Sequence, residues 1–175
     1  MERAPYLYIE YKTFSIFDYR IRILKDRELQ IMLIRPPTTE CEFKAYYAFR
    51  WKILRQPWEQ PPGSEKDACE NEAIHLAAWD DTGCLIGVGR LHLVRENVGQ
   101  VRYMAVDPAR RSHGIGKAIL QELELRALRT GIREIKLNAR QDAVQFYQKN
   151  GYQVLRPSET LFGTIPHFEM WKQLG

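Results

Sequence analysis

The sequence has few cysteines and no long apolar segment. Its three cysteines, Cys41, Cys69 and Cys84, are an odd number, form no C-x-x-C pair and stand at no zinc-like spacing from a histidine. We therefore expect reduced thiols and no metal site. No apolar run approaches the roughly 20 residues of a membrane-spanning helix, and the N-terminus lacks the parts of a signal peptide. These absences favour a cytoplasmic protein without a membrane partner.

The sequence also lacks a broad basic face. Lys and Arg number 26 against 22 Asp and Glu, which gives a net charge of +4. Apart from one loop, Arg110–Lys117, the basic residues are scattered along the chain. A nucleic-acid-binding protein concentrates its positive charge, so we expect an anionic cofactor and no nucleic-acid partner. The length of 175 residues suits one domain with a substantial core.

The most informative stretch runs from Tyr103 to Leu128. Met104-Ala105-Val106 reads as the end of a buried strand, which Asp107-Pro108 stops. A basic loop with two glycines follows, and a helix is predicted behind it from apolar residues at steps of four: Ile115, Ile119 and Leu123. A helix N-terminus offers unpaired N–H groups and partial positive charge, and glycines let the backbone close around an anion. The loop therefore predicts a diphosphate site.

Two common nucleotide-binding motifs do not fit this loop. A P-loop reads G-x-x-x-x-G-K-[ST], but Arg111 replaces its first glycine and Ala118 replaces its Ser or Thr. A dinucleotide-binding fingerprint reads G-x-G-x-x-G/A directly after a strand. Here Ile119 replaces the third glycine, and several residues separate Gly114 from the strand end. Both usual nucleotide interpretations fail on these details.

Two segments resemble the GNAT N-acetyltransferase superfamily. The loop Arg111–Gly116 resembles its [RQ]-x-x-G-x-[GA] acyl-CoA motif, and Ala143–Tyr152 resembles its A-x-x-F-Y-x-x-x-G-[FY] helix. Glu65–His75 and Gly163–Met170 further resemble segments of the ElaA-like subgroup, although Arg55-Gln56 stands where that subgroup has Glu-Gln. The resemblance implies an α/β (α+β) fold with a mixed, mostly antiparallel sheet, splayed at the acetyl-CoA site and flanked by helices.

The resemblance sets one domain at residues 30–175. Residues 1–29 form an N-terminal extension of unknown role, in which we expect an extra strand or hairpin at Tyr6–Tyr11 and Tyr19–Leu24, unless the native chain starts at Met32. Homodimers are common in the family. We expect helices at 39–54, 115–129 and 141–150, and strands at Gln30–Arg35, His75–Trp79, Cys84–Val94, Val98–Val106, Glu134–Asn138, Tyr152–Leu155 and Ile165–Leu174. Gly87 and Gly89 indicate a bulge or a close backbone approach.

The resemblance implies transfer of an acetyl group from acetyl-CoA to a primary amine of a small molecule or protein, by direct attack in a ternary complex. A bulged strand, Met104, Ala105 and Val106, would aim an N–H group at the thioester carbonyl. Asn138 would contact the cofactor or order a water. The CoA diphosphate would bind the loop residues Arg111, Ser112, His113, Gly114, Ile115, Gly116 and Lys117. The alternative is a CoA-binding sensor or scaffold without turnover.

Two proton transfers complete the implied reaction. Tyr147 occupies the position of the family's general acid, where it also contacts the cofactor; its phenol, with an ordinary pKa near 10, suits a leaving thiol of roughly 8–9. The alternative is that Tyr147 only packs. Candidates for the base that deprotonates the amine are Glu70, Glu72, His75 and Tyr103; His75 is equally well a core histidine. The acceptor would lie near the Pro57–Ser64 loop, and its identity is not readable from the sequence.

Overall fold

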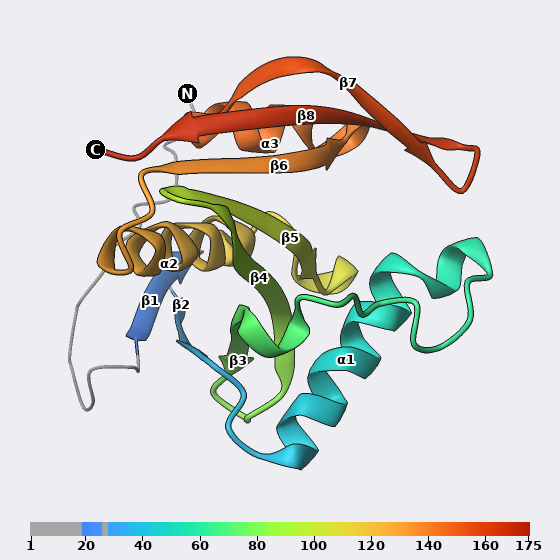
Figure 1. The fold of residues 1–175 in the computed structure, drawn as a ribbon. Helices are drawn as coiled ribbons and strands as arrows, with labels where there is room; N and C mark the ends of the chain where they lie inside the picture. Colours follow the sequence, from blue (N-terminus) through green and yellow to red (C-terminus); the bar gives the residue numbers. More distant parts are fainter. Residues whose placement is uncertain (1–18, 26–27) are drawn as a thin grey trace, which may run out of the picture. The chain divides into compact units, whose positions relative to one another are not determined.

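The computed structural model describes residues 19–25 and 28–175 (Figure 1). Its strands form a sheet in the order β1-β2-β3-β4-β5-β6-β8-β7. The strands are β1 (Tyr19–Lys25), β2 (Glu28–Arg35), β3 (Ile74–Asp80), β4 (Leu85–Arg95), β5 (Val98–Val106), β6 (Glu134–Arg140), β7 (Gln153–Leu161) and β8 (Ile165–Gln173). The helices are α1 (Glu40–Leu54), α2 (Ile115–Arg129) and α3 (Val144–Lys149).

Chain contacts divide the described residues into two compact units. Unit 1 comprises the described residues up to Asp67 with His75–Gly89 and Tyr103–Glu122, and unit 2 comprises Ala68–Ile74, Arg90–Arg102 and Leu123–Gly175. The long elements β4, β5 and α2 each begin in one unit and end in the other. Both units therefore contain β-strands and helical residues.

The seven predicted strands are all present, and β1 confirms the expected strand at 19–24. The other expected strand of the N-terminal extension, Tyr6–Tyr11, lies outside the described residues. The largest difference in length is in β7, which continues to Leu161 although we expected it to end at Leu155. Its residues are mostly exposed, it contains Pro157 and its pairing with β8 shifts register twice. An exposed edge strand tolerates proline and needs no alternation of apolar and polar residues. The sequence after Leu155 therefore lacks the alternation from which a strand is predicted.

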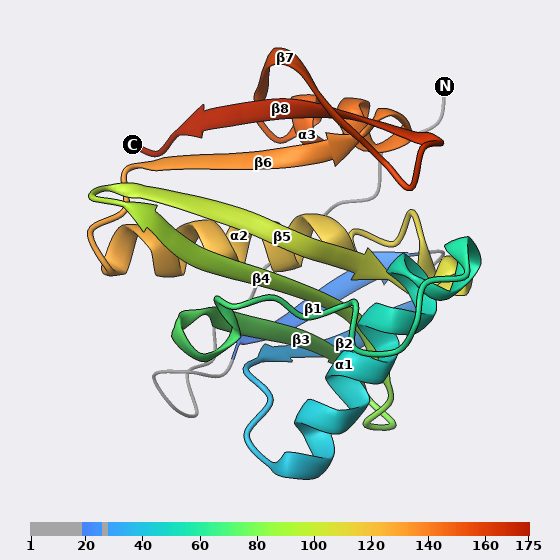
Figure 2. The same cartoon turned by 45° about the vertical axis from the view of Figure 1, so that its right-hand side comes forward.

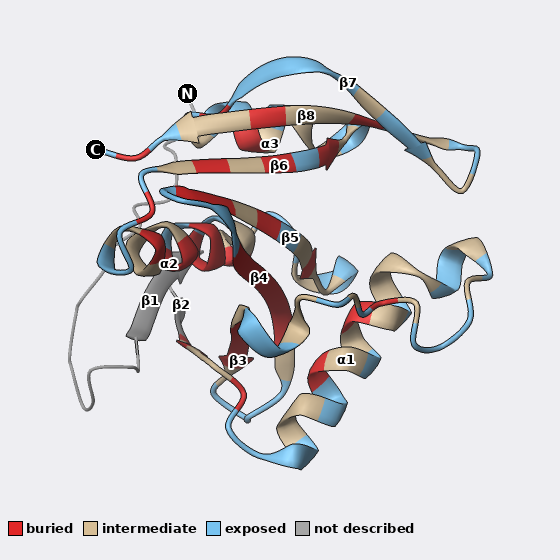
Figure 3. Cartoon of the chain, viewed as in Figure 1, coloured by how far each residue is buried: buried red, intermediate tan, exposed pale blue. Residues whose placement is uncertain are grey.

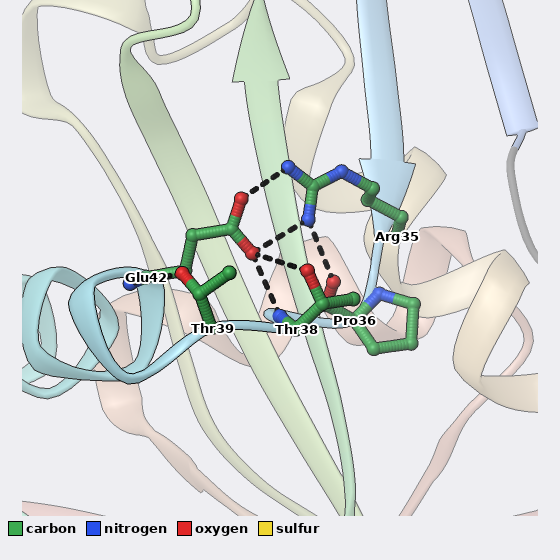
Figure 4. A network of polar contacts seen from close by, with 5 residues as sticks. All are labelled: Arg35, Pro36, Thr38, Thr39 and Glu42. Carbon is green, nitrogen blue, oxygen red and sulfur yellow. Dashed lines mark hydrogen bonds and ion pairs between the residues drawn. The ribbon is translucent and has the colours of Figure 1, made fainter.

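The first turn of α1 is fixed by Thr39 and Glu42 (Figure 4). Thr39 Oγ1 accepts a hydrogen bond from the Glu42 N–H at 3.2 Å, so Thr39 is the N-cap of the helix. The Glu42 carboxylate accepts from the Thr38 N–H at 2.7 Å and binds Arg35 at the end of β2. These bonds hold the pKa of Glu42 at about 2, below its ordinary 4.5, against the opposing effect of burial.

The core of unit 1 lies between α1, the sheet and the start of α2. Tyr46 on α1 is fully buried among Ala77, Trp79 and Val88, and its hydroxyl donates to the Gly89 carbonyl at 3.0 Å. Buried residues are frequent along α2 (Figure 3). The predicted apolar residues are among them: Ile115 and Ile119 in unit 1, and Leu123 in the part of α2 that belongs to unit 2. The sheet thus presents buried surface to both helices.

Gly87 lets α2 approach β4 closely, as its position in the strand predicted. A Cβ atom there would lie 2.8 Å from Ile119 Cδ1, 3.0 Å from Ile115 Cγ2 and 3.3 Å from the Ala105 carbonyl oxygen. These separations are at or below van der Waals contact, so a side chain at this position would displace its neighbours. Gly87 therefore determines how near the N-terminus of α2 lies to the sheet.

In unit 2, β6 pairs in parallel with the start of β5, from Val98↔Glu134 to Gln100↔Lys136, and antiparallel with β8 along its whole length. The helix α3 lies along β6 and β8 in both views (Figure 1, Figure 2). Tyr147 on α3 and Tyr152 after it are buried, with ring centroids 5.7 Å apart. The short helix is therefore anchored to the sheet by aromatic side chains.

None of the three cysteines forms a disulfide: Cys41 and Cys84 are exposed and Cys69 is half-buried. Across residues 19–25 and 28–175, no helix is long and apolar enough to span a membrane. The same part of the chain holds no cluster of three or more His, Cys, Asp or Glu side chains suited to a metal ion.

Candidate functional site

The strand β5 has an irregular backbone at Tyr103. This residue has φ of +55°, a left-handed conformation that only a few per cent of non-glycine residues adopt. Holding an ordinary residue there costs on the order of 1–3 kcal/mol, and such residues gather at functional sites. Tyr103 directly precedes Met104-Ala105-Val106, the segment in which we predicted a bulge. The backbone of β5 therefore changes direction where the predicted N–H donor begins.

Three side chains of unit 1 contact the Tyr103 side chain. Its hydroxyl donates to Asp67 Oδ2 at 3.1 Å. The Arg50 guanidinium carbon lies 3.7 Å from the ring centroid, and that of Arg55 lies 5.5 Å from it. The side chain is therefore held at both its face and its polar tip, and its hydroxyl faces a carboxylate.

The loop before α2 offers backbone N–H groups. Ser112 and Gly114 have φ of +66° and +76°, so the chain turns sharply twice within three residues. The first helical hydrogen bond joins the Ala118 N–H to the Gly114 carbonyl at 3.0 Å. The N–H groups of the preceding first turn, Ile115 to Lys117, have no partner within an α-helix of this register. Tight turns and N–H groups without a helical partner are the features by which a helix N-terminus binds anions in general.

The side chains of the loop support the same conclusion. His113 Nδ1 lies 2.7 Å from the Arg111 carbonyl oxygen and 3.1 Å from that of Arg110, which closes the loop on itself. Arg111, Ser112 and Lys117 are exposed. Two exposed cations therefore flank the N-terminus of α2, where the helix dipole adds partial positive charge.

His75 is buried in an aromatic environment. Its ring centroid lies 5.3 Å from that of Tyr46, 5.6 Å from that of Phe43 and 6.2 Å from that of Tyr47, each in an edge-to-face arrangement. Such packing is typical of a core histidine. The contacts favour a structural role over that of a base.

The two acidic candidates in unit 2 differ in their surroundings. Glu70 Oε1 lies 2.5 Å from Nη1 of Arg90, which is fully buried and also donates to His92 Nδ1 at 3.2 Å. Glu72 is exposed. Glu70 thus compensates a buried charge, whereas Glu72 is free to meet a solute.

Unit 2 also carries Tyr147 and Asn138. Tyr147 is buried beside Phe146, and burial raises the pKa of its phenol well above 10. The phenol is therefore protonated over the whole physiological range. Asn138 is exposed on β6, where it is paired with Glu169 of β8. Of the predicted donor-binding residues, these two belong to unit 2 and all the others to unit 1.

The sequence interpretation missed Arg50 and Arg90, both of which are fully buried. Arg50 lies over the Tyr103 ring and Arg90 pairs with Glu70, and because these two partners are remote in the sequence, no local pattern reveals the contacts. The one available signal is an arginine inside an otherwise aromatic helical segment, Tyr46-Tyr47-Ala48-Phe49-Arg50-Trp51, because a charge is rarely placed among aromatic rings without a specific partner.

The sequence profile of the Acetyltransferase (GNAT) family matches residues 43–152, which include most of α1, the strands β3 to β6, the loop before α2, and the helices α2 and α3. The chain belongs to this GNAT family. The uncharacterized N-acetyltransferase YjcF of Bacillus subtilis is 33% identical over 133 residues, which cover 76% of this chain and 94% of YjcF.

Solved GNAT structures share the mixed, mostly antiparallel sheet with flanking helices. A proposed N-acetyltransferase from Lactobacillus plantarum has a TM-score of 0.73 at 23% identity, covering 82% of this chain and 99% of its own. Escherichia coli ElaA has a TM-score of 0.67 at 15% identity, covering 82% and 99%. An aminoglycoside 6'-N-acetyltransferase complexed with coenzyme A has a TM-score of 0.65 at 17% identity, covering 77% and 92%. The chain thus has the GNAT fold, and the family implies an acyl-CoA donor and an acceptor.

Proposed function

We propose that this protein is an acetyl-CoA-dependent N-acetyltransferase that acetylates a primary amine by direct attack in a ternary complex. The observation that carries the proposal is the arrangement in unit 1. There, a strand with a left-handed residue, Tyr103, leads into a cationic loop whose N–H groups open toward solvent at the start of α2. A GNAT family match with that arrangement supports acyl-CoA as the donor.

The loop would hold the CoA diphosphate. The N–H groups of the first turn of α2 and of the left-handed turns at Ser112 and Gly114 donate to its oxygens, and Arg111 and Lys117 add positive charge. Acetyl-CoA supplies an activated acetyl group as a thioester. The backbone of Met104–Val106 would donate to the thioester carbonyl oxygen, which stabilises the negative charge that develops there when the amine attacks.

Tyr147 would protonate the departing thiolate. Its phenol is protonated at neutral pH, which is the state an acid requires. Burial raises its pKa further above that of the leaving thiol than the ordinary value near 10, so the acid role needs the thiolate to be held against the hydroxyl. Glu70, Glu72, His75 and Tyr103 stay the candidates for removal of the amine proton, directly or through water. The Glu70–Arg90 pair and the aromatic surroundings of His75 make these two the weaker candidates.

The proposal is tested by calorimetric titration with acetyl-CoA and CoA of the wild type, Gly114→Glu and a matched control, Gly131→Glu. Both glycines have positive φ, +76° and +85°, so both variants carry the same backbone strain and the same added charge. We expect micromolar binding by the wild type and the control, and at least about tenfold weaker binding by Gly114→Glu, which corresponds to about 1.4 kcal/mol. Absence of wild-type binding, or equal losses in both variants, would overturn the assignment of the loop.

Turnover is tested separately by release of free thiol from acetyl-CoA with a panel of small amines and N-terminal peptides. Thiol release that depends on the amine supports the transferase. Binding of acetyl-CoA with no release for any amine would instead indicate a CoA-binding sensor of the same fold.

A further inference from the structure

The left-handed conformation of Tyr103 requires support, because an isolated tyrosine avoids it. The support visible in unit 1 is a guanidinium against the ring face. The Arg50 Cζ atom lies 3.7 Å from the centroid of the Tyr103 ring, which is a stacked contact, and the Arg50 side chain is fully buried. A cation over an aromatic face is attracted most strongly when both are removed from water.

The same guanidinium also holds the segment that follows α1. Arg50 Nη2 donates to the Glu65 carbonyl oxygen, and Glu65 Oε2 in turn accepts from the Gly63 N–H at 2.7 Å. Two residues beyond Glu65, Asp67 accepts the Tyr103 hydroxyl. The loop of residues 56–67 therefore contacts Tyr103 at one end through Asp67 and contacts its stacking partner through Glu65.

The chemistry of this contact requires arginine. A planar guanidinium stacks on a ring with its face while its N–H groups donate at its edge. Lysine keeps the charge but presents a compact ammonium that does not stack. Arg50 uses both properties: its guanidinium lies over the Tyr103 ring, and its Nη2 donates to the Glu65 carbonyl oxygen. Its Cζ also lies 5.5 and 5.4 Å from the rings of Tyr46 and Tyr47 on its own helix.

We propose that Arg50 is a positioning residue for the thioester-polarising backbone: it holds Tyr103 in the left-handed conformation that aims the Met104–Val106 N–H groups, and it ties that backbone to the loop of residues 56–67. The inference rests on the proposed acetyl-CoA donor. It assigns to a residue of α1 an effect on the reacting carbonyl.

The carbonyl itself provides the readout. Acetyl-CoA labelled with ¹³C at the acetyl carbonyl is bound to the protein, and the carbonyl stretching band is recorded by infrared difference spectroscopy. A donated hydrogen bond lowers the frequency of this band. We expect a lowered band in the wild type and, in Arg50→Lys, a return of at least half of that shift toward the free value, with the CoA dissociation constant changed by less than about twofold. Arg55→Lys, whose guanidinium is 5.5 Å from the same ring, is the matched control and keeps the wild-type band.

A second background separates positioning from general stability. Glycine adopts a positive φ without support, so in Tyr103→Gly the backbone no longer needs Arg50. We expect Arg50→Lys to leave the carbonyl band of the Tyr103→Gly protein unchanged. An equal loss of the shift in both backgrounds, or no loss in Arg50→Lys alone, would overturn the proposal.

Failure of the role proposed for Arg50 can be distinguished from failure of the proposed function. If the wild type binds no acetyl-CoA, the donor assignment fails, but the backbone of residue 103 can still be read from the Cα and Cβ chemical shifts of ¹³C-labelled tyrosine. Loss of the left-handed shifts in Arg50→Lys with retention in Arg55→Lys would support the role of Arg50 in holding Tyr103. Unchanged shifts in Arg50→Lys would refute that role.

Discussion

Arg35 and Glu42 face one another with two parallel contacts, Nη1 to Oε2 at 2.8 Å and Nη2 to Oε1 at 2.5 Å (Figure 4). The pair joins the last residue of β2 to the first turn of α1 across Pro36-Pro37. Glu42 additionally accepts from the N–H and hydroxyl of Thr38. One carboxylate therefore fixes where α1 leaves the sheet.

This pair predicts an acid-sensitive contribution to stability. The pKa of Glu42 is about 2 in the folded protein against 4.5 ordinarily, so its contribution is complete above pH 4.5 and is lost as the pH falls toward 2. Glu42→Gln should lower the free energy of unfolding by about 1 kcal/mol at pH 7, and by much less at pH 2. Urea unfolding over that pH range measures the difference. Glu40→Gln, at an exposed first-turn acid, is the control; the same pH dependence in both variants would contradict the prediction.

Gly87→Ala should destabilise the protein by about 1–3 kcal/mol, because the new methyl group would press on Ile119, Ile115 and the Ala105 carbonyl. Thermal and urea unfolding provide the measurement. Since Ile115 begins α2, the variant should also bind CoA more weakly in calorimetry. Gly175→Ala, where nothing lies within 4 Å, should leave both quantities unchanged. Equal stability of the two variants would show that α2 moves away from β4 at little cost.

Neutralising Glu70 and neutralising Glu72 should have different effects on the free energy of unfolding. Glu70→Gln removes the charge opposite the fully buried Arg90 and should cost about 3 kcal/mol of unfolding free energy. Glu72→Gln, at an exposed position, should change it by less than about 0.5 kcal/mol. If the exposed Glu72 carboxylate attracts a cationic amine acceptor, Glu72→Gln should nevertheless raise the KM of that amine. An unchanged KM would refute a role of Glu72 in acceptor binding.

Tyr147→Phe should lower kcat by about 10²-fold or more, the usual worth of a positioned acid, with little change in CoA affinity. Tyr152→Phe removes a hydroxyl from a second buried tyrosine and is the control. Equal kcat values for the two variants would leave Tyr147 with a packing role only.

Burial of Tyr147 also predicts a pH effect on the fold. Because its folded pKa is raised above the unfolded value of 10, its stabilising effect is complete below pH 10 and declines above it, as the unfolded chain loses its proton first. Unfolding of wild type and Tyr147→Phe between pH 9 and 11 tests the sign.

The sequence predicts those parts of the fold that carry a local pattern. The apolar steps in α2 are visible in a short window of the sequence, and the structure confirms that these residues are buried. The length of β7 was not predictable, since an exposed edge strand with Pro157 has no buried face to produce alternation. The left-handed Tyr103 was likewise hidden, because tyrosine is not a residue that signals positive φ.

The candidate site shows the same division. The loop at Arg111–Lys117 is recognisable because its glycines and cations are contiguous in the chain. The contacts of Arg50 with Tyr103, and of Arg90 with Glu70, join residues that meet only after folding. Such pairs depend on tertiary packing, so single-sequence reasoning identifies the donor loop and misses the buried cations around it.

The exposure of Cys41 and Cys84 determines how this protein can be followed in solution. Reagents that detect thiol released from CoA also react with accessible protein thiols. The protein itself therefore adds a background signal to a thiol-release assay. Replacing both residues by serine would leave Cys69, which is half-buried, as the remaining thiol. Restoring Cys41 or Cys84 singly would then give one accessible attachment point, in the first turn of α1 or in the β3–β4 turn, for a fluorescent reporter of acceptor binding.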